Sequence, residues 1–305
     1  MFPTVFSQVL ILFILISLGY ILTKFNMITK EGATQMTDIA LIVVTPCVII
    51  KSFVRPFDKS ELKDLLLCFL ITAIIHIGFI AVSAAVFNPK YSKQARVRRF
   101  AAIFSNSGFV AIPLQQAIIG DNGVFYGSAY LAVFNVIMWT YGVYLMSGDR
   151  KYIKGKSLVL NPGLIGVTLG LIIFLFSIPL PKIIYDSVSY VAALNTPLPM
   201  IILGYYLAKS NPFKVLKSIP NIVSILFRNL LLPLAAMIIM YLCGIRGTML
   251  TALSISACAP AASACTMFSA KFDADTPLSV GLVSLSTALS LISVPIVITL
   301  SMLLA

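Results

Sequence analysis

The sequence predicts an all-α membrane protein with ten transmembrane helices, arranged as a 5+5 inverted repeat. Three observations lead to this prediction. The chain of 305 residues is 59% hydrophobic and 10% charged, with a mean hydropathy of +1.01, which is far more apolar than a soluble domain. Its apolar residues form segments long enough to cross a bilayer. Two of these segments are interrupted by Gly, Pro and small polar residues at corresponding places in the two halves.

The repeat is supported by one offset, which places similar residues at matching positions of residues 1–152 (spans one to five) and 153–305 (spans six to ten). Five spans in each half give the halves opposite orientations in the membrane. The offset is 151 positions, and it relates Ser105 to Ser256, Asn135 to Ser286, and Thr45-Pro46 to Thr196-Pro197.

The first three spans are expected at residues 4–22, 33–53 and 65–87. Span one lacks a basic leader and a small-residue cleavage site, so we expect it to be a retained helix. Span two is broken at Pro46, which removes an intrahelical hydrogen bond and frees a carbonyl that Thr45 can bind.

Span four contains the first interruption, IFSNSGFVAIPL at residues 103–114, and ends near Gly120. Backbone groups freed within lipid must be satisfied by protein, water, an ion or a ligand, so this stretch predicts a broken helix at a substrate site. A kinked helix is the alternative, because Gly and Pro are common in membrane helices. A turn at residues 121–123 leads to span five, residues 124–146, which holds Asn135.

The second half repeats this order, with spans at residues 162–180, 188–207, 222–242 and 278–304 and the second interruption at 253–265. Span seven is broken at Pro197, as span two is at Pro46. Span eight carries Arg228 about two turns from its cytoplasmic end. Arg228 could bind an anionic substrate, but its depth favours snorkelling to the membrane surface.

Three residues are candidates for coupling. His76, at the centre of span three, could relay protons, but the absence of a carboxylate on the same span favours an interhelical hydrogen bond. The hydroxyls of Ser286 and Thr287 on span ten usually serve helix packing, and beside a break they could ligate sodium. We therefore expect no metal site and no cofactor other than a coupling Na⁺ or H⁺.

The formal net charge of +12 reflects membrane orientation rather than nucleic-acid binding. Sixteen of the 22 Lys and Arg residues, including Lys90 and Arg228, fall at one side of the ten spans. The positive-inside rule then predicts that both termini lie outside the cell. The protein itself is expected to be a multi-pass protein of the inner (plasma) membrane. The five cysteines lack metal-ligand or disulfide spacing, and four of them are expected to be buried free thiols; Cys258 is the exception by position, because it lies in the second interruption.

The two broken helices are expected to cross at their interruptions. Helix N-termini then present partial positive charge and free carbonyls present partial negative charge, so an anion and a cation are both accommodated. The residues expected to bind substrate are Asn106, Ser107, Gly108, Pro113, Asn135, Ser256, Cys258, Ala259, Pro260 and Ser263.

The chain resembles the auxin efflux carrier family in its compact bacterial branch of malate and malonate permeases, related in plan to bile acid–sodium symporters. The resemblance covers the whole chain, and rests on NSGFVAIPL at 106–114, the Thr-Pro break of span two, and AKFDAD at 270–275. It implies transport of small organic anions, with Asn106, Pro113 and Pro260 lining the site. It also implies a scaffold of spans one, two, six and seven, a mobile domain of spans three to five and eight to ten, an elevator motion, and a homodimer.

The sequence departs from the plant members in two places. It lacks their long central loop, and span three offers only His76 where they have an acidic and a basic residue. A sodium–proton antiporter is the alternative transporter, but it needs a carboxylate on span five, which has Asn135 instead. A ligand-binding membrane sensor on the same fold is a further alternative. The residues for acid–base or metal catalysis are missing, so an enzyme is not expected.

Overall fold

The computed structural model describes residues 2–88, 92–209 and 212–305, and their side chains except at positions 2–6, 8, 9, 157, 158 and 212–214. Lys90, counted above among the basic residues, lies outside this range. Regular structure in the described ranges is helical, apart from one isolated antiparallel bridge between Ser105 and Ala261. The prediction of an all-α protein is therefore confirmed.

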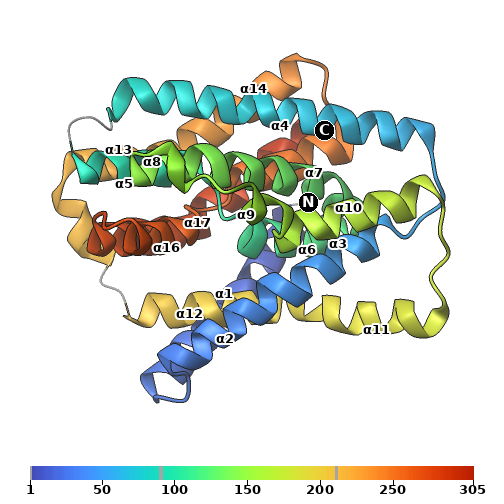
Figure 1. Ribbon diagram of the computed structural model, residues 1–305, viewed down its shortest axis with the longest axis horizontal. Helices are drawn as coiled ribbons and strands as arrows, with labels where there is room; N and C mark the ends of the chain where they lie inside the picture. The colour runs from blue at the N-terminus through green and yellow to red at the C-terminus, as the bar shows by residue number, and fades with distance from the viewer. Residues whose placement is uncertain (1, 89–91, 210–211) are drawn as a thin grey trace.

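The first half consists of helices that mostly run along the long axis of the molecule (Figure 1). Several of them contain a short π-helical segment, labelled η. The elements are α1 (Phe2–Lys24), α2 (Lys30–Ile39), η1 (Ala40–Val44), α3 (Thr45–Phe53), α4 (Lys59–Val86), α5 (Lys93–Ile103), η2 (Ser107–Ala111), α6 (Ile112–Ile119), α7 (Asp121–Ile137), η3 (Met138–Gly142) and α8 (Val143–Ser147).

The second half has the same character, and its η elements are 3₁₀-helical except for the π-helical η7. The first half closes with the 3₁₀-helical η4 (Arg150–Tyr152). The elements of the second half are α9 (Gly155–Val159), α10 (Pro162–Leu175), α11 (Lys182–Ala192), η5 (Ala193–Asn195), α12 (Pro197–Lys209), η6 (Pro212–Lys217), α13 (Ile219–Leu226), η7 (Phe227–Leu231), α14 (Leu232–Leu242), α15 (Gly247–Cys258), α16 (Ala264–Lys271) and α17 (Thr276–Leu304).

Membrane-length helices dominate the fold. Within the described residues, six continuous segments are long and apolar enough to cross a bilayer. They are Lys30–Phe53, Lys59–Val86, Asp121–Ser147, Lys182–Lys209, Ile219–Leu242 and Thr276–Leu304. Shorter apolar helices accompany them at Leu10–Lys24, Ser107–Ile119, Pro162–Leu175 and Gly247–Cys258. The predicted membrane protein is thereby confirmed.

One expected span ends early. The sequence predicted a helix over residues 162–180, whereas α10 stops at Leu175. Pro179 and Pro181 explain the difference, because each disfavours helical backbone in the residue before it and lacks an amide donor. The chain then turns, and the next helix begins at Lys182.

Proline explains where the helices change winding. A π-helical segment precedes Pro46, Pro113 and Pro233, and a 3₁₀ turn precedes Pro197. Proline has no N–H and clashes with the carbonyl four residues earlier, so a wider or tighter turn relieves the helix. At the first site the Thr45 hydroxyl donates to the Ala40 carbonyl at 2.8 Å, as the Thr-Pro pattern predicted.

Glycine allows the closest helix contacts. A Cβ added at Gly204 of α12 would lie 2.1 Å from the Ile16 carbonyl oxygen of α1, so the two backbones touch. A Cβ at Gly166 of α10 would lie 2.9 Å from the Pro46 Cα of α3. Packing of this kind, with small residues at the contact, holds helices together in lipid. In Figure 1, α2, α3, α11 and α12 accordingly occupy the lower side, while α4 and α14 lie along the upper side.

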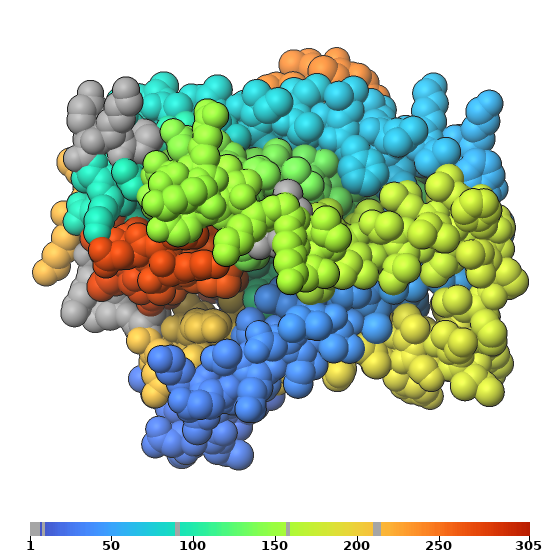
Figure 2. Space-filling model, in the orientation of Figure 1, coloured from blue at the N-terminus to red at the C-terminus, as the bar shows by residue number. Residues whose placement is uncertain are grey.

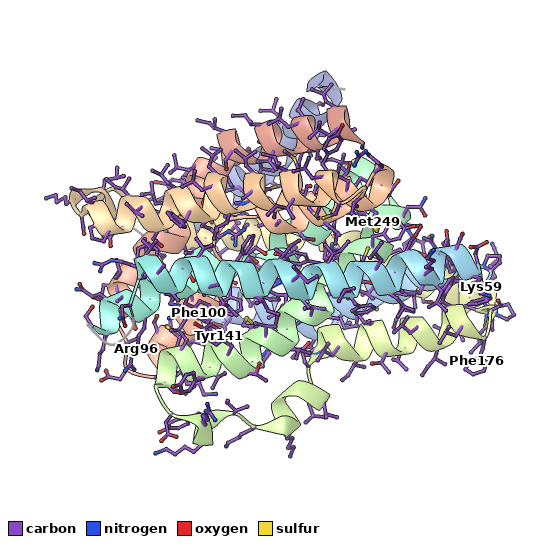
Figure 3. The ribbon with its side chains drawn as sticks, turned by 90° about the horizontal axis from the view of Figure 1, so that it is seen from above. Lys59, Arg96, Phe100, Tyr141, Phe176 and Met249 are labelled. Carbon is purple, nitrogen blue, oxygen red and sulfur yellow. The ribbon has the colours of Figure 1, made fainter. Side chains whose placement is uncertain are left out.

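The two ends of the bundle differ in the loops they carry. Figure 3 shows Lys59 and Phe176 at one end and Arg96 near the other, with Phe100 and Tyr141 between the ends. At the Arg96 end, Lys93 of α5 contacts Asp273 in the loop after α16 at 2.6 Å. The carboxylate of Asp273 accepts a hydrogen bond from Lys93, which lowers the pKa of Asp273 below its usual value.

Candidate functional site

The two helix interruptions lie against each other near the centre of the molecule. The chain between α5 and η2 and the chain between α15 and α16 are extended, and they pair antiparallel. The backbone N–H of Asn106 donates to the Pro260 carbonyl at 2.7 Å, and the backbone N–H of Ala262 donates to the Phe104 carbonyl at 2.9 Å. Each interruption thus satisfies backbone groups freed by the other, as burial in lipid requires.

Arg228 reaches this junction from η7. Its guanidinium donates to the carbonyls of Ala102 at 3.3 Å and Ile103 at 2.8 Å, at the C-terminus of α5. It also donates to the Ala257 carbonyl at the C-terminus of α15. The side chain is 1% exposed and lies over the Phe79 ring. The snorkelling interpretation of Arg228 is therefore wrong, and this residue leaves the count of basic residues at the membrane surface.

The charge of Arg228 is not matched by a carboxylate. No Asp or Glu among the described residues lies within ion-pair distance of it. The C-terminal carbonyls of α5 and α15 carry partial negative charge, which stabilises the guanidinium. Its Nε atom is buried without a hydrogen-bond partner. A full positive charge is consequently held inside the bundle by backbone carbonyls, helix dipoles and the Phe79 ring, without a carboxylate partner among the described residues.

Asn106 and Ser107 begin the helix that follows the first interruption. The Asn106 Oδ1 accepts a hydrogen bond from the Phe109 amide at 3.3 Å, which caps this helix. The Asn106 Nδ2 and the Ser107 Oγ are buried and have no partner. Unpaired buried polar atoms are costly and need a ligand or water to satisfy them.

Two further predicted residues of the first interruption, Pro113 and Gly108, belong to the helix that follows it. Pro113 is buried two residues after the end of η2, and explains the π-helical winding there. Gly108 is half-buried, and a Cβ added to it would lie 3.9 Å from the Leu131 side chain, in ordinary contact.

The second interruption is anchored to α17. Cys258, Ala259 and Pro260 are fully buried. The next amide, of Ala261, donates to the Ser286 hydroxyl at 2.9 Å. The sequence had offered Ser286 as a ligand for a coupling ion, and here its hydroxyl binds the break.

Asn229 completes this anchor and was missed by the sequence analysis. The Ser286 hydroxyl donates to the Asn229 Oδ1 at 2.5 Å, and the Asn229 Nδ2 donates to the Ser286 carbonyl at 2.8 Å. The available signal was a second strongly polar residue beside Arg228 in a mostly apolar span. Thr287 uses its hydroxyl within its own helix, donating to the Val283 carbonyl at 2.8 Å.

Gln115 ties the two interrupted helices together and was also missed. Its Nε2 donates to the Ser256 hydroxyl and to the Ala252 carbonyl, each at 2.8 Å. Gly127 of α7 makes room for this side chain, since a Cβ there would lie 2.0 Å from the Gln115 Oε1. Ser256, predicted to bind substrate, therefore serves as a contact between α6 and α15.

Two predicted residues lie beside the junction rather than in it. The Nδ1 of His76 is 2.9 Å from the Thr72 carbonyl of its own helix, so the expected interhelical hydrogen bond is not the bond that forms. Its Nε2 has no partner, and its ring lies 5.0 Å from that of Tyr130. Asn135 accepts a hydrogen bond from Asn161, at the N-terminus of α10, with a distance of 3.3 Å.

A cavity of about 220 Å³ adjoins the second interruption between α12, α16 and α17. Figure 2 shows the surface hollowed between the orange-red α16 and the golden α12. Ser263, predicted to bind substrate, opens the first turn of α16 on its wall. The remaining lining residues are Leu203, Tyr206, Leu207, Thr266, Met267, Ala270, Val280, Val283, Ser284 and Thr287.

Membrane-length helices with buried interruptions that leave polar groups unpaired define the class of polytopic membrane transporters. Residues 4–298 match the family described as membrane transport protein, and the chain belongs to this family. The sequence is 30% identical over 297 residues to an uncharacterized transporter of Methanothermobacter thermautotrophicus, covering 95% of this chain and 96% of that protein. It is 24% identical over 301 residues to an uncharacterized transporter of Methanocaldococcus jannaschii, covering 93% and 94%.

The protein is therefore a membrane transporter and not an enzyme, as the sequence predicted. Membership of this family also confirms the resemblance to the auxin efflux carriers on which the sequence interpretation drew.

Proposed function

We propose that this transporter is a secondary carrier of small organic anions, bound at the junction of its two helix interruptions. One observation carries the proposal: Arg228 is buried at the junction, 1% exposed, with no carboxylate within ion-pair distance among the described residues. Helix N-termini after both interruptions add partial positive charge. The junction thus favours a negative ligand, and a carboxylate is the anion whose oxygens suit the free Asn106 and Ser107 groups.

The transporter is proposed to have ten spans in two inverted repeats. The six long segments supply six spans. The other four would be α1, the interrupted α5 with α6, α10, and the interrupted α15 with α16. Spans four and nine then cross at their breaks, and both termini lie outside. Arg96 lies near one end of the bundle (Figure 3), and Lys93 stands in the same first turn of α5, which supports this orientation in a plasma membrane.

An elevator motion is proposed, in which α4–α8 and α13–α17 move against a scaffold of α1–α3 and α10–α12. Apolar contacts along part of the boundary between these groups support it, since packed helices can slide past one another there. The hydrogen bond from Asn161 to Asn135 and the ion pair of Lys51 with Asp121 also cross this boundary and would break in the motion. Leu12 and Leu203 of the scaffold face Val110 and Val294 around a small cavity. The scaffold is also proposed to form the interface of a homodimer.

Spin labels on α12 and α16 test this motion. We expect the distance between them to change when substrate is added, while a pair on α1 and α12 keeps its distance. Equal behaviour of both pairs would contradict the elevator. Light scattering of the purified protein tests the dimer, since a monomeric mass would contradict it.

Thermal stabilisation of the purified protein tests the proposed substrate class. A panel of mono- and dicarboxylates is added with and without sodium, at two pH values. A ligand at 100 times its dissociation constant stabilises the folded state by about 2.7 kcal/mol, which is a readily measured shift. We expect at least one carboxylate to raise the unfolding temperature, and the dependence of its shift on sodium or pH identifies the coupling ion.

Asn106→Asp is the variant that tests the site. Aspartate keeps the side-chain oxygen that caps the helix, removes the unpaired Nδ2 and adds a negative charge. We expect it to fold and to lose the carboxylate response. A shift for sodium alone, with none for any acid, would instead support the antiporter.

A further inference from the structure

Four half-helix ends meet at the junction, and Arg228 donates hydrogen bonds to the two C-terminal ends. Its guanidinium hydrogen-bonds Ala102 and Ile103, at the C-terminus of α5, and Ala257, at the C-terminus of α15. It thereby takes up the carbonyl ends of both interrupted helices. The N-terminal ends, which begin at Ser107 and at Ala264, receive no such group from Arg228.

Carbonyl oxygens at interrupted helices are the ligands that transporters use for monovalent cations. Three carbonyls from two converging helix ends, each bearing partial negative charge, form a cluster of this kind at the junction. The guanidinium fills it with a positive charge that cannot be lost by deprotonation in a protein. The cluster therefore has the geometry and charge for a cation and is occupied by a side chain.

The N-terminal side has the opposite character. The Asn106 Nδ2 and the Ser107 Oγ are buried, with exposures of 4% and 1% for their residues, and lack partners. They stand at a helix start, where partial positive charge favours an anion. The carbonyl ends at the junction are thus satisfied by protein, whereas the helix start at Asn106 and Ser107 carries buried polar atoms that the protein leaves unpaired.

We propose that Arg228 determines the charge selectivity of the junction: its guanidinium excludes monovalent cations from the carbonyl ends of α5 and α15, and leaves only the helix N-terminal ends for substrate. The anion half of this inference rests on the proposed function, whereas the exclusion of cations does not. Arg228 is a positioning residue, since its donors bind the protein backbone rather than the substrate.

Removing the charge of Arg228 distinguishes charge selectivity from a purely structural role. Glutamine at this position retains a hydrogen-bond donor but no charge, so the carbonyls regain their affinity for a cation. Lysine retains the charge and continues to exclude cations, with fewer donors. A structural role alone predicts that both substitutions weaken folding and that neither changes the response to cations.

The experiment measures thermal unfolding of the purified protein in NaCl, KCl, LiCl and choline chloride at equal ionic strength. The variants are Arg228→Gln and Arg228→Lys, and Arg150→Gln serves as a control that removes a charge from an exposed site. We expect Arg228→Gln to gain a saturable stabilisation by one of the small cations over choline. The wild type, Arg228→Lys and Arg150→Gln should not gain it.

The carboxylate that stabilises the wild type is then titrated against each variant. We expect Arg228→Gln to bind it at least about tenfold more weakly, because a nearby positive charge is removed, and Arg228→Lys to lose less. Absence of a carboxylate response in the wild type would contradict the proposed function, while the gain of cation response in Arg228→Gln would still support the exclusion.

Two results would overturn the inference. One is a folded Arg228→Gln whose response to the four salts equals that of the wild type. The other is failure of both Arg228 variants to fold in every salt, since the residue would then act only in holding the structure together.

Discussion

The two helix interruptions occupy matching places in the chain but differ in how their polar groups are satisfied. At the second, the Ala261 amide is bound by Ser286, which is held in turn by Asn229. At the first, the Asn106 Nδ2 and the Ser107 Oγ are buried and unpaired. The comparison teaches that a broken helix can serve as an anchor or as a binding surface, depending on whether neighbouring helices supply its hydrogen bonds.

Removing the anchor of the second interruption should have the largest effect on stability. Asn229→Ala leaves the Ser286 carbonyl and the Ser286 hydroxyl without their buried partner. We expect unfolding to be easier by about 2–3 kcal/mol, measured by thermal or denaturant unfolding. Thr287→Ala is the matched control, because that hydroxyl bonds only within its own helix, and it should cost less than about 1 kcal/mol. An equal fall in the free energy of unfolding in both variants would show that Asn229 does not anchor the second interruption.

Removing the unpaired side-chain amide nitrogen of Asn106, at the first interruption, should affect substrate binding rather than folding. Asn106→Ala loses a helix cap worth about 1 kcal/mol, and it also removes a buried Nδ2 that has no partner. We expect little net change in unfolding temperature and at least about tenfold weaker carboxylate binding by titration. Unchanged affinity would show that Asn106 does not contact the substrate.

The bridge between the interrupted helices should have an intermediate effect that is confined to stability. Gln115→Leu removes two hydrogen bonds, to Ser256 and Ala252, and also a buried Oε1 that lacks a partner. The loss of two hydrogen bonds is partly offset by the removal of the unpaired oxygen. We therefore expect the free energy of unfolding to fall by about 1 kcal/mol, with unchanged affinity for the carboxylate. Loss of affinity without loss of stability would instead place Gln115 at the substrate.

The ion pair at the end of these helices should have the smallest effect. The hydrogen bond from Lys93 lowers the pKa of Asp273, so the folded form is the stronger acid. The stability contributed by the pair is therefore present above the pKa of Asp273 in the unfolded chain and is lost as the pH falls through its lower folded pKa. Both side chains are largely exposed, so Asp273→Asn should leave the unfolding temperature unchanged near neutral pH in physiological salt.

Features that depend on local sequence were predictable. Pro46 and Thr45 produced a local change of helix winding and the expected hydroxyl-to-carbonyl bond, because both partners lie five positions apart in a helix that continues through Pro46. The extended segments at Phe104 and Pro260 likewise result from prolines and small polar residues inside apolar runs. These signals act over a few residues, so the sequence alone carries them.

Features that depend on the rotation of a helix against its neighbours were not predictable. Arg228 lies two turns from the end of its span, where a long side chain can extend outward or inward, and only packing of η7 against α5 and α15 decides. Gln115 and Asn229 find partners 137 and 57 positions away. Those pairings require the positions of several helices, which hydropathy does not provide.

Exchange of a labelled carboxylate across proteoliposomes tests the central claim most directly. The compound is the acid that stabilises the wild type, and the comparison is between the wild type, Asn106→Asp and Ser301→Ala at equal protein content. Ser301 is the control because its buried hydroxyl bonds only the Ile298 carbonyl of its own helix. The account predicts exchange by the wild type and by Ser301→Ala, and none by Asn106→Asp although it remains folded. Exchange by Asn106→Asp at the wild-type rate would contradict the assignment of the junction as the site of anion transport.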